Sequence, residues 1–134
     1  MPTEPEPLMS YDEWMESPAR MLFLRPSMYV GKAGIFLVEA FLRGFDTARE
    51  GAVLDGFHQW LDMRLGYLSA CGPTVRLVGI QCPEWSITDP VPSEFDETIR
   101  NQWLQLLDEF IAERTERGLP DILERYRLWR EARV

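Results

Sequence analysis

The chain has 134 residues, the size of one ordinary domain, and 46% of them are apolar, which excludes disorder along its whole length. Its formal net charge of −8 disfavours binding to nucleic acid, because the phosphate backbone would repel it. There is no basic leader before an apolar run and no apolar stretch long enough to cross a bilayer, so we expect a cytoplasmic protein with no membrane partner.

The first residues differ in composition from the rest of the chain. Residues 1–9 alternate proline with acid and show no apolar periodicity, so we expect a flexible acidic tail there. Residues 10–134 are rich in apolar side chains and contain no repeat or low-complexity segment. We expect them to form a single helical domain.

Two cap signals near the start of this domain predict short helices. Ser10 and Glu13 have the spacing of a capping box, in which each side chain bonds the backbone of the other residue. The helix that follows should end before Pro18, because proline cannot continue the hydrogen-bond ladder. Ser17 followed by Pro18 is a cap and a favoured first-turn residue, which predicts a second helix over residues 18–23.

Apolar periodicity predicts further helices in the middle of the chain. Apolar residues recur at helical spacing over residues 35–45 and again over 53–65. Residues 73–82 allow two interpretations, since Pro73 can open a helix, whereas their β-branched residues also fit a strand near 75–81. A lone strand would have no partner elsewhere in the sequence, so we favour the helix.

The long helix from Glu94 to about Glu116 has the clearest pattern. Its apolar residues fall at steps of three and four, at Phe95, Ile99, Trp103, Leu106, Leu107, Phe110 and Ile111. Gly118 ends it, and Pro120 opens a last helix. The predicted fold is therefore an all-α single-domain bundle of about five or six helices with the long helix at its centre.

Few residues offer catalytic or metal chemistry. His58 is the only histidine, and the two cysteines, Cys71 and Cys82, are too few and too far apart for a metal-binding motif. We expect no metal and no cofactor, and we expect both thiols to be reduced and buried. Adjacent carboxylates such as Asp108 and Glu109 point in different directions on a helix, which indicates a solvated face and not an acid–base pair.

The surplus negative charge lies in two short stretches. Residues 1–16 and 84–97 each contain five acids and no basic residue. Such fields favour encounter with a basic protein partner, although both stretches could instead be solvated ends that keep the protein soluble. The predicted partner-binding residues, with an exposed aromatic anchor among them, are Asp12, Glu13, Glu16, Glu84, Trp85, Asp89, Glu94 and Glu97.

The string Arg-Pro-Ser-Met-Tyr-Val-Gly, from Arg25 to Gly31, resembles a segment near the start of gyrase-type ATPase domains. That resemblance implies a glutamate base, which Glu39 could match, but Arg43 stands where those domains have a magnesium-binding asparagine. No Asp-x-Gly-x-Gly segment follows, so we do not expect such a domain. The alternative function is a small hydrolase or nucleotide-binding domain using Arg25, Tyr29 and Glu39. The string also fits a purely structural turn.

The same string, with Phe-Leu-Arg-Gly-Phe at 41–45 and the run over 103–110, resembles a group of small acidic bacterial proteins. Some of them serve as immunity proteins or toxin partners, so the resemblance implies protein binding without catalysis. The leading hypothesis is a non-enzymatic, immunity- or antitoxin-like module that binds a basic partner. A structural homodimer is a second alternative, and the sequence leaves open whether the protein is a monomer or a homodimer.

Overall fold

The computed structural model describes residues 7–26 and 34–133, and residues 1–6, 27–33 and 134 lie outside this description. Every regular element within the described residues is a helix, which confirms the predicted all-α fold. Seven helices are found there, slightly more than the expected five or six.

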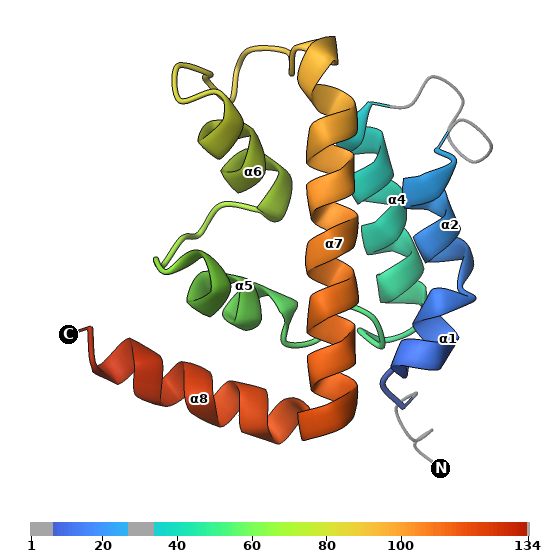
Figure 1. Ribbon diagram of the computed structural model, residues 1–134, viewed down its shortest axis with the longest axis vertical. Coiled ribbons are helices and arrows are strands. Elements are labelled where there is room, and N and C mark those ends of the chain that lie inside the picture. The colour runs from blue at the N-terminus through green and yellow to red at the C-terminus, as the bar shows by residue number, and fades with distance from the viewer. Residues whose placement is uncertain (1–6, 27–33, 134) are drawn as a thin grey trace.

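The helices surround one long element, α7 (Ser93–Arg117), which begins and ends within a residue of its predicted bounds. The others are α1 (Tyr11–Met15), α2 (Pro18–Leu24), α4 (Ile35–Ala48), α5 (Phe57–Leu65), α6 (Pro73–Gln81) and α8 (Leu119–Glu131). In Figure 1, α1, α2 and α4 lie on one side of α7, and α5 and α6 lie on the other. Helix α8 leaves the C-terminal end of α7 and packs against α5.

Both predicted caps are confirmed. The Ser10 hydroxyl accepts from the Glu13 amide at 3.2 Å, and the Glu13 carboxylate accepts from the Ser10 amide at 3.3 Å. The Ser17 hydroxyl accepts from the Arg20 amide at 3.1 Å, with Pro18 in the first turn of α2. These bonds satisfy amides that a helix start leaves unpaired, so local sequence determines where α1 and α2 begin.

The predicted helix over residues 53–65 was placed too early, because α5 begins four residues later. The amides of Val53 and Leu54 donate to the Asp46 carboxylate, at 2.9 and 2.8 Å, and form a turn. Gly56 then has a φ of +87°, a left-handed conformation that interrupts a right-handed helix. The apolar residues at 53 and 54 therefore reflect burial and not helical backbone, since Val53 is fully buried in the turn before α5.

The uncertain segment 73–82 is helical, and the described residues contain no strand. Pro73 occupies the first turn of α6, as the helical interpretation required. The β-branched residue Thr74 is buried and accepts a hydrogen bond from the Trp103 indole at 2.8 Å. Packing against α7 therefore favours the helix in a segment whose sequence alone fits either a helix or a strand.

The core lies along α7, as its periodicity predicted. Its buried apolar residues are Ile99, Trp103, Leu106, Leu107, Phe110 and Ile111. Aromatic rings from α5 complete this core: the Phe57 ring lies 5.6 Å from the Trp103 ring and 5.2 Å from the Phe110 ring, measured between centroids. Such stacked and tilted contacts add specificity to the apolar burial.

The end of the predicted tail belongs to the folded domain. Met9 is buried, its amide donates to the Ala52 carbonyl at 2.9 Å, and its own carbonyl accepts from Arg114. The Arg114 guanidinium is only 3% exposed and also donates to the carbonyls of Val53, Asp55 and Ala52. Burial lowers the pKa of Arg114 to about 10. Met9 therefore packs with the helices, while residues 1–6 of the predicted tail lie outside the described residues.

Candidate functional site

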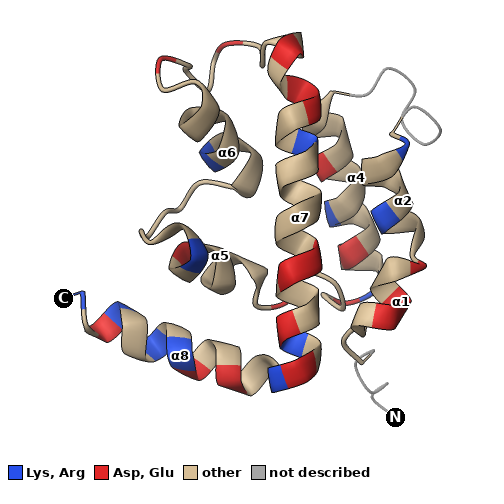
Figure 2. Cartoon of the chain, viewed as in Figure 1, with Lys and Arg blue, Asp and Glu red and all other residues tan. Residues whose placement is uncertain are grey.

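One end of the bundle carries exposed carboxylates, and we call residues 84–97 the acidic end. It comprises the loop after α6 and the first turns of α7, where acidic residues gather in Figure 2. Glu84, Glu94 and Glu97 are exposed, and among the described residues no salt bridge to them is found. Asp89 is also exposed, and its carboxylate accepts from the Ser86 amide at 3.3 Å. Three of the predicted acids thus face solvent without a neutralising partner in that part of the chain.

Asp96 belongs to the same stretch but has a different role. Its carboxylate accepts from the backbone amide of Ile35, the first residue of α4, at 2.8 Å. It also pairs with Arg100 across one helical turn at 3.6 Å. A carboxylate at a helix N-terminus stabilises that helix through its unpaired amides and dipole. Asp96 therefore stabilises the start of α4 and is not one of the free carboxylates of the acidic end.

Trp85 is half-buried and is not the exposed anchor that the sequence suggested. Its indole N–H donates to the carbonyls of Asp89 and Pro90, at 3.2 and 3.3 Å, which closes the loop. Its ring stacks on Phe36 of α4, with 6.5 Å between centroids. The exposed apolar residue of this loop is Ile87, at 67% exposure. Ile87 lies in a loop without apolar periodicity, so no sequence pattern marked it as a candidate contact residue.

The predicted acids of α1 lie far from the acidic end. Helix α1 packs on the C-terminal half of α7, where the Tyr11 amide donates to the Thr115 hydroxyl at 2.9 Å. Along α7 the axial separation between Glu94 and Thr115 is about 30 Å. Asp12, Glu13 and Glu16 therefore form a separate patch, and Glu13 is in addition committed to the capping box. Among the described residues, the acids of α1 and those of the acidic end therefore do not form one surface.

Other acids are bound inside the molecule. Asp62 is 2% exposed and pairs with Arg76, with 2.6 Å between Oδ1 and Nη1. Asp108 accepts from the Trp14 indole at 2.7 Å and holds Arg20 through both of its oxygens. These internal acceptors join elements that are distant in sequence, in contrast to the free carboxylates of the acidic end.

The residues of the enzyme alternative are not assembled by the described part of the chain. Tyr29 lies outside the described residues, and Arg25 is an exposed residue at the end of α2. The Glu39 carboxylate pairs with Arg43 on its own helix at 3.2 Å. Neither Arg25 nor Glu39 lines the cavities described below. The geometry that this alternative requires is thus not observed among these residues.

The histidine and the two cysteines, the other candidates for chemistry, all lie within the described residues. His58 Nε2 lies 2.8 Å from the Ser69 carbonyl and 3.7 Å from Asp62 Oδ2. Both thiols are free, but Cys71 is exposed and Cys82 only half-buried, which corrects the expectation that they are buried. Within the described residues, no three His, Cys, Asp or Glu side chains are arranged to hold a metal ion.

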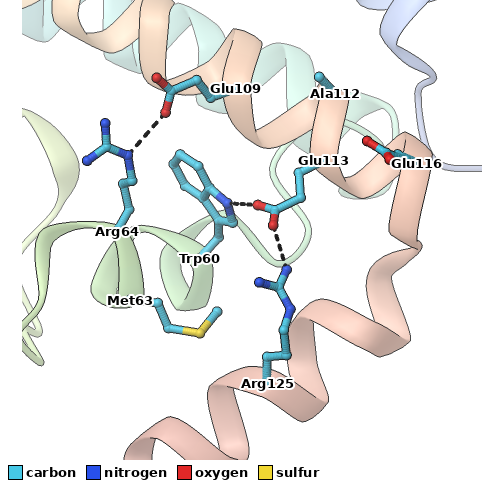
Figure 3. Close-up of a pocket in the computed structure, with 8 residues that line it drawn as sticks. All are labelled: Trp60, Met63, Arg64, Glu109, Ala112, Glu113, Glu116 and Arg125. Atoms are coloured by element: carbon cyan, nitrogen blue, oxygen red, sulfur yellow. Dashed lines mark hydrogen bonds and ion pairs between the residues drawn. The ribbon is translucent and has the colours of Figure 1, made fainter.

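A cavity of about 530 Å³ opens between α5, α7 and α8 (Figure 3). Its apolar lining comes from Trp60, Met63 and Ala112. The Trp60 indole donates to Glu113, which also accepts from Arg125 at 2.7 Å. Sequence patterns did not single out this cavity, because its three walls meet only in the folded chain.

A second cavity of about 230 Å³ lies between α5, α6 and α7. It shares Arg64 with the first, and Leu65, Leu77, Ile80 and Leu106 provide its apolar lining. Arg64 pairs with Glu109 at 3.1 Å at the junction of the two cavities.

The comparisons with known proteins yield no relative: no family model, no curated protein and no solved structure matches the chain. Functional inference for this chain therefore depends on its own residues. Among the helices of the described residues, none combines the length and the apolar character needed to cross a membrane.

Proposed function

We propose that this chain is a non-enzymatic protein-binding module, of the kind represented by immunity and antitoxin proteins, and that its acidic end contacts a basic partner. The observation that carries the proposal is the contrast between two sets of acids. Asp62, Asp96 and Asp108 each bond to a group of another helix, whereas Glu94 and Glu97 face solvent without an ion-pair partner among the described residues.

Unpaired carboxylates gathered at one end of a molecule favour binding to a positively charged surface. They attract a basic partner over the range of the Debye length, about 8 Å at physiological salt, and speed the encounter. They also disfavour acidic partners, because like charges brought together cost several kcal/mol. The proposed contact thus needs no catalytic group and no deep pocket at this end.

The apolar part of the proposed contact is Ile87. It projects from the loop that the Trp85 indole closes, and it is 67% exposed. Interfaces commonly combine a central apolar anchor with a polar rim. Glu84 and Asp89, on either side of Ile87 in the sequence, would supply that rim.

Site-specific photocrosslinking identifies the partner. A photoreactive amino acid is placed at Ile87 and, as the control, at the exposed Ala48 at the end of α4, and each variant is irradiated in the cells that normally make the protein. We expect one predominant basic protein to be captured at position 87 and not at 48. Equal capture at both positions, or none at 87, contradicts the proposal.

Charge removal then tests the contact with the purified partner. The variant Glu94→Gln/Glu97→Gln and the control Asp12→Asn/Glu16→Gln change the net charge by the same amount, the first at the acidic end and the second at α1. We expect the first to weaken binding by about tenfold or more at low salt and the second to change it little. Equal effects of the two variants would mean that only net charge matters, which contradicts a defined contact surface.

A further inference from the structure

The two cavities follow one another along α7 and meet at the Arg64–Glu109 pair, and together we call them the α7 groove. They share Arg64, and their α7 residues are Gln102, Gln105, Leu106, Glu109, Ala112, Glu113 and Glu116. Steps of three and four residues place these side chains on one face of the helix. From Gln102 to Glu116 this face extends about 21 Å, or four helical turns.

The same face of α7 reaches the acidic end. Glu94, Gln105 and Glu116 are spaced by eleven residues, which is close to three full turns, so they point in nearly the same direction from the helix axis. Glu94 belongs to the acidic end, and Glu116 lines the opposite end of the α7 groove. A segment lying along α7 would therefore meet a free carboxylate at each end, about 33 Å apart.

The charges in the lower half of the groove are unequal. Glu109, Glu113 and Glu116 face two cations, Arg64 and Arg125. Each cation is already paired, Arg64 with Glu109 and Arg125 with Glu113, as Figure 3 shows. Within the described residues Glu116 is exposed and has no salt bridge, so the groove keeps a net negative charge.

The upper half of the groove is apolar. Its lining includes Leu65, Leu77 and Leu106, and at its edge Ile80 is 51% exposed. An apolar side chain of a partner that covers Ile80 would remove further area from water, at about 25 cal/mol per Å². In order along α7 there are thus the free carboxylate of Glu94, the largely apolar upper half of the groove, the Arg64–Glu109 pair, and the free carboxylate of Glu116 at the lower end.

From this distribution we propose that the α7 groove binds a helical segment of the basic partner, with apolar residues at its centre and Lys or Arg residues toward both ends. This inference rests on the proposed function and names the part of the partner that is bound. A helix presents apolar residues at steps of three and four along one side, which matches a groove bounded by helices. Its terminal cations complement Glu94 and Glu116, which no internal cation neutralises among the described residues.

Crosslinking from inside the groove tests the placement. A photoreactive amino acid replaces Gln105, an exposed residue that lines the upper half of the groove, and Ala48 again serves as the control position. We expect position 105 to capture the same protein as position 87, with the crosslink mapping to a basic, amphipathic peptide of that protein. Capture at 87 without capture at 105 overturns the groove inference and leaves the proposed function standing. No capture at either position overturns both.

A matched pair of substitutions tests the apolar contact with the captured protein in purified form. Ile80→Glu places a charge in the groove, and Leu37→Glu places the same charge on α4 at an equally exposed position, 51% against 52%. We expect Ile80→Glu to weaken binding by about tenfold or more and Leu37→Glu to leave it nearly unchanged. Circular dichroism verifies that both variants are folded. Equal binding by the two variants overturns the inference.

Discussion

Asp62 and Arg76 form an ion pair from which solvent is almost fully excluded, since their side chains are 2% and 1% exposed. Arg76 also donates to the Tyr67 carbonyl at 3.0 Å and lies over the Tyr67 ring. The Tyr126 hydroxyl approaches the second oxygen of Asp62 at 3.4 Å. This buried pair thus joins α5 to α6, to the loop between them through Tyr67, and to α8 through Tyr126. All of these elements lie on the side of α7 that carries the α7 groove.

Loss of one partner from this pair should destabilise the protein strongly. The substitution Arg76→Met leaves the buried Asp62 carboxylate without its arginine partner, and we expect the free energy of unfolding to fall by about 3–5 kcal/mol. The control Arg64→Met breaks the half-exposed pair with Glu109 and should cost at most about 1 kcal/mol. Urea denaturation of both variants measures the difference. Similar losses of unfolding free energy in the two variants would contradict the expectation that a buried ion pair is costlier to break than a half-exposed one.

A methyl group at Gly56 should be less tolerated than one at Gly66. Both glycines have positive φ, +87° and +85°, so alanine is strained at each by about 1–2 kcal/mol. At Gly56 the added carbon would also lie 2.4 Å from Leu119 Cδ1, whereas at Gly66 nothing lies within 4 Å. Because Leu119 Cδ1 is the end of a flexible side chain that can turn away, we expect Gly56→Ala to cost only about 1 kcal/mol more than Gly66→Ala in thermal or urea unfolding. Equal losses of unfolding free energy in the two variants would show that Leu119 moves aside without measurable cost.

Alanine at Gly44 should stabilise the protein. Gly44 lies inside α4, where an added carbon meets nothing within 4 Å. Alanine is favoured over glycine in a helix interior by about 1 kcal/mol, so the free energy of unfolding should rise by that order. Urea denaturation at low protein concentration measures the change. A decrease that appears only at high protein concentration would instead favour the structural homodimer, with a second copy packed closely on α4.

The pKa of Glu124 should depend on Arg127. A side-chain hydrogen bond from Arg127 favours the charged carboxylate and lowers the pKa of Glu124 below its ordinary value. The stabilisation that this bond provides is present above the pKa of the unfolded chain and is lost as the pH falls through the lower pKa of the folded protein. In an NMR titration of the carboxyl carbon, we expect Arg127→Gln to raise the pKa of Glu124. The control Arg130→Gln should leave it unchanged, and an equal rise in both variants would indicate a general field effect.

Local sequence was sufficient to predict much of this fold. The caps at Ser10 and Ser17 were found because a capping residue and its target lie three residues apart. The core face of α7, from Ile99 to Ile111, was found because one helix repeats its direction every 3.6 residues. In each case the interacting groups are near neighbours in the chain, so their spacing contains the required information.

Tertiary structure alone decided which acids are free. Asp46, Asp62 and Asp96 look no different in the sequence from Glu94, yet the first three are bound to Val53, Arg76 and Ile35. The same holds for the separation of the α1 acids from the acidic end among the described residues, and for the α7 groove. The physical reason is that charge pairing and cavity shape depend on distances between residues far apart in the chain, and those distances exist only once the helices have packed.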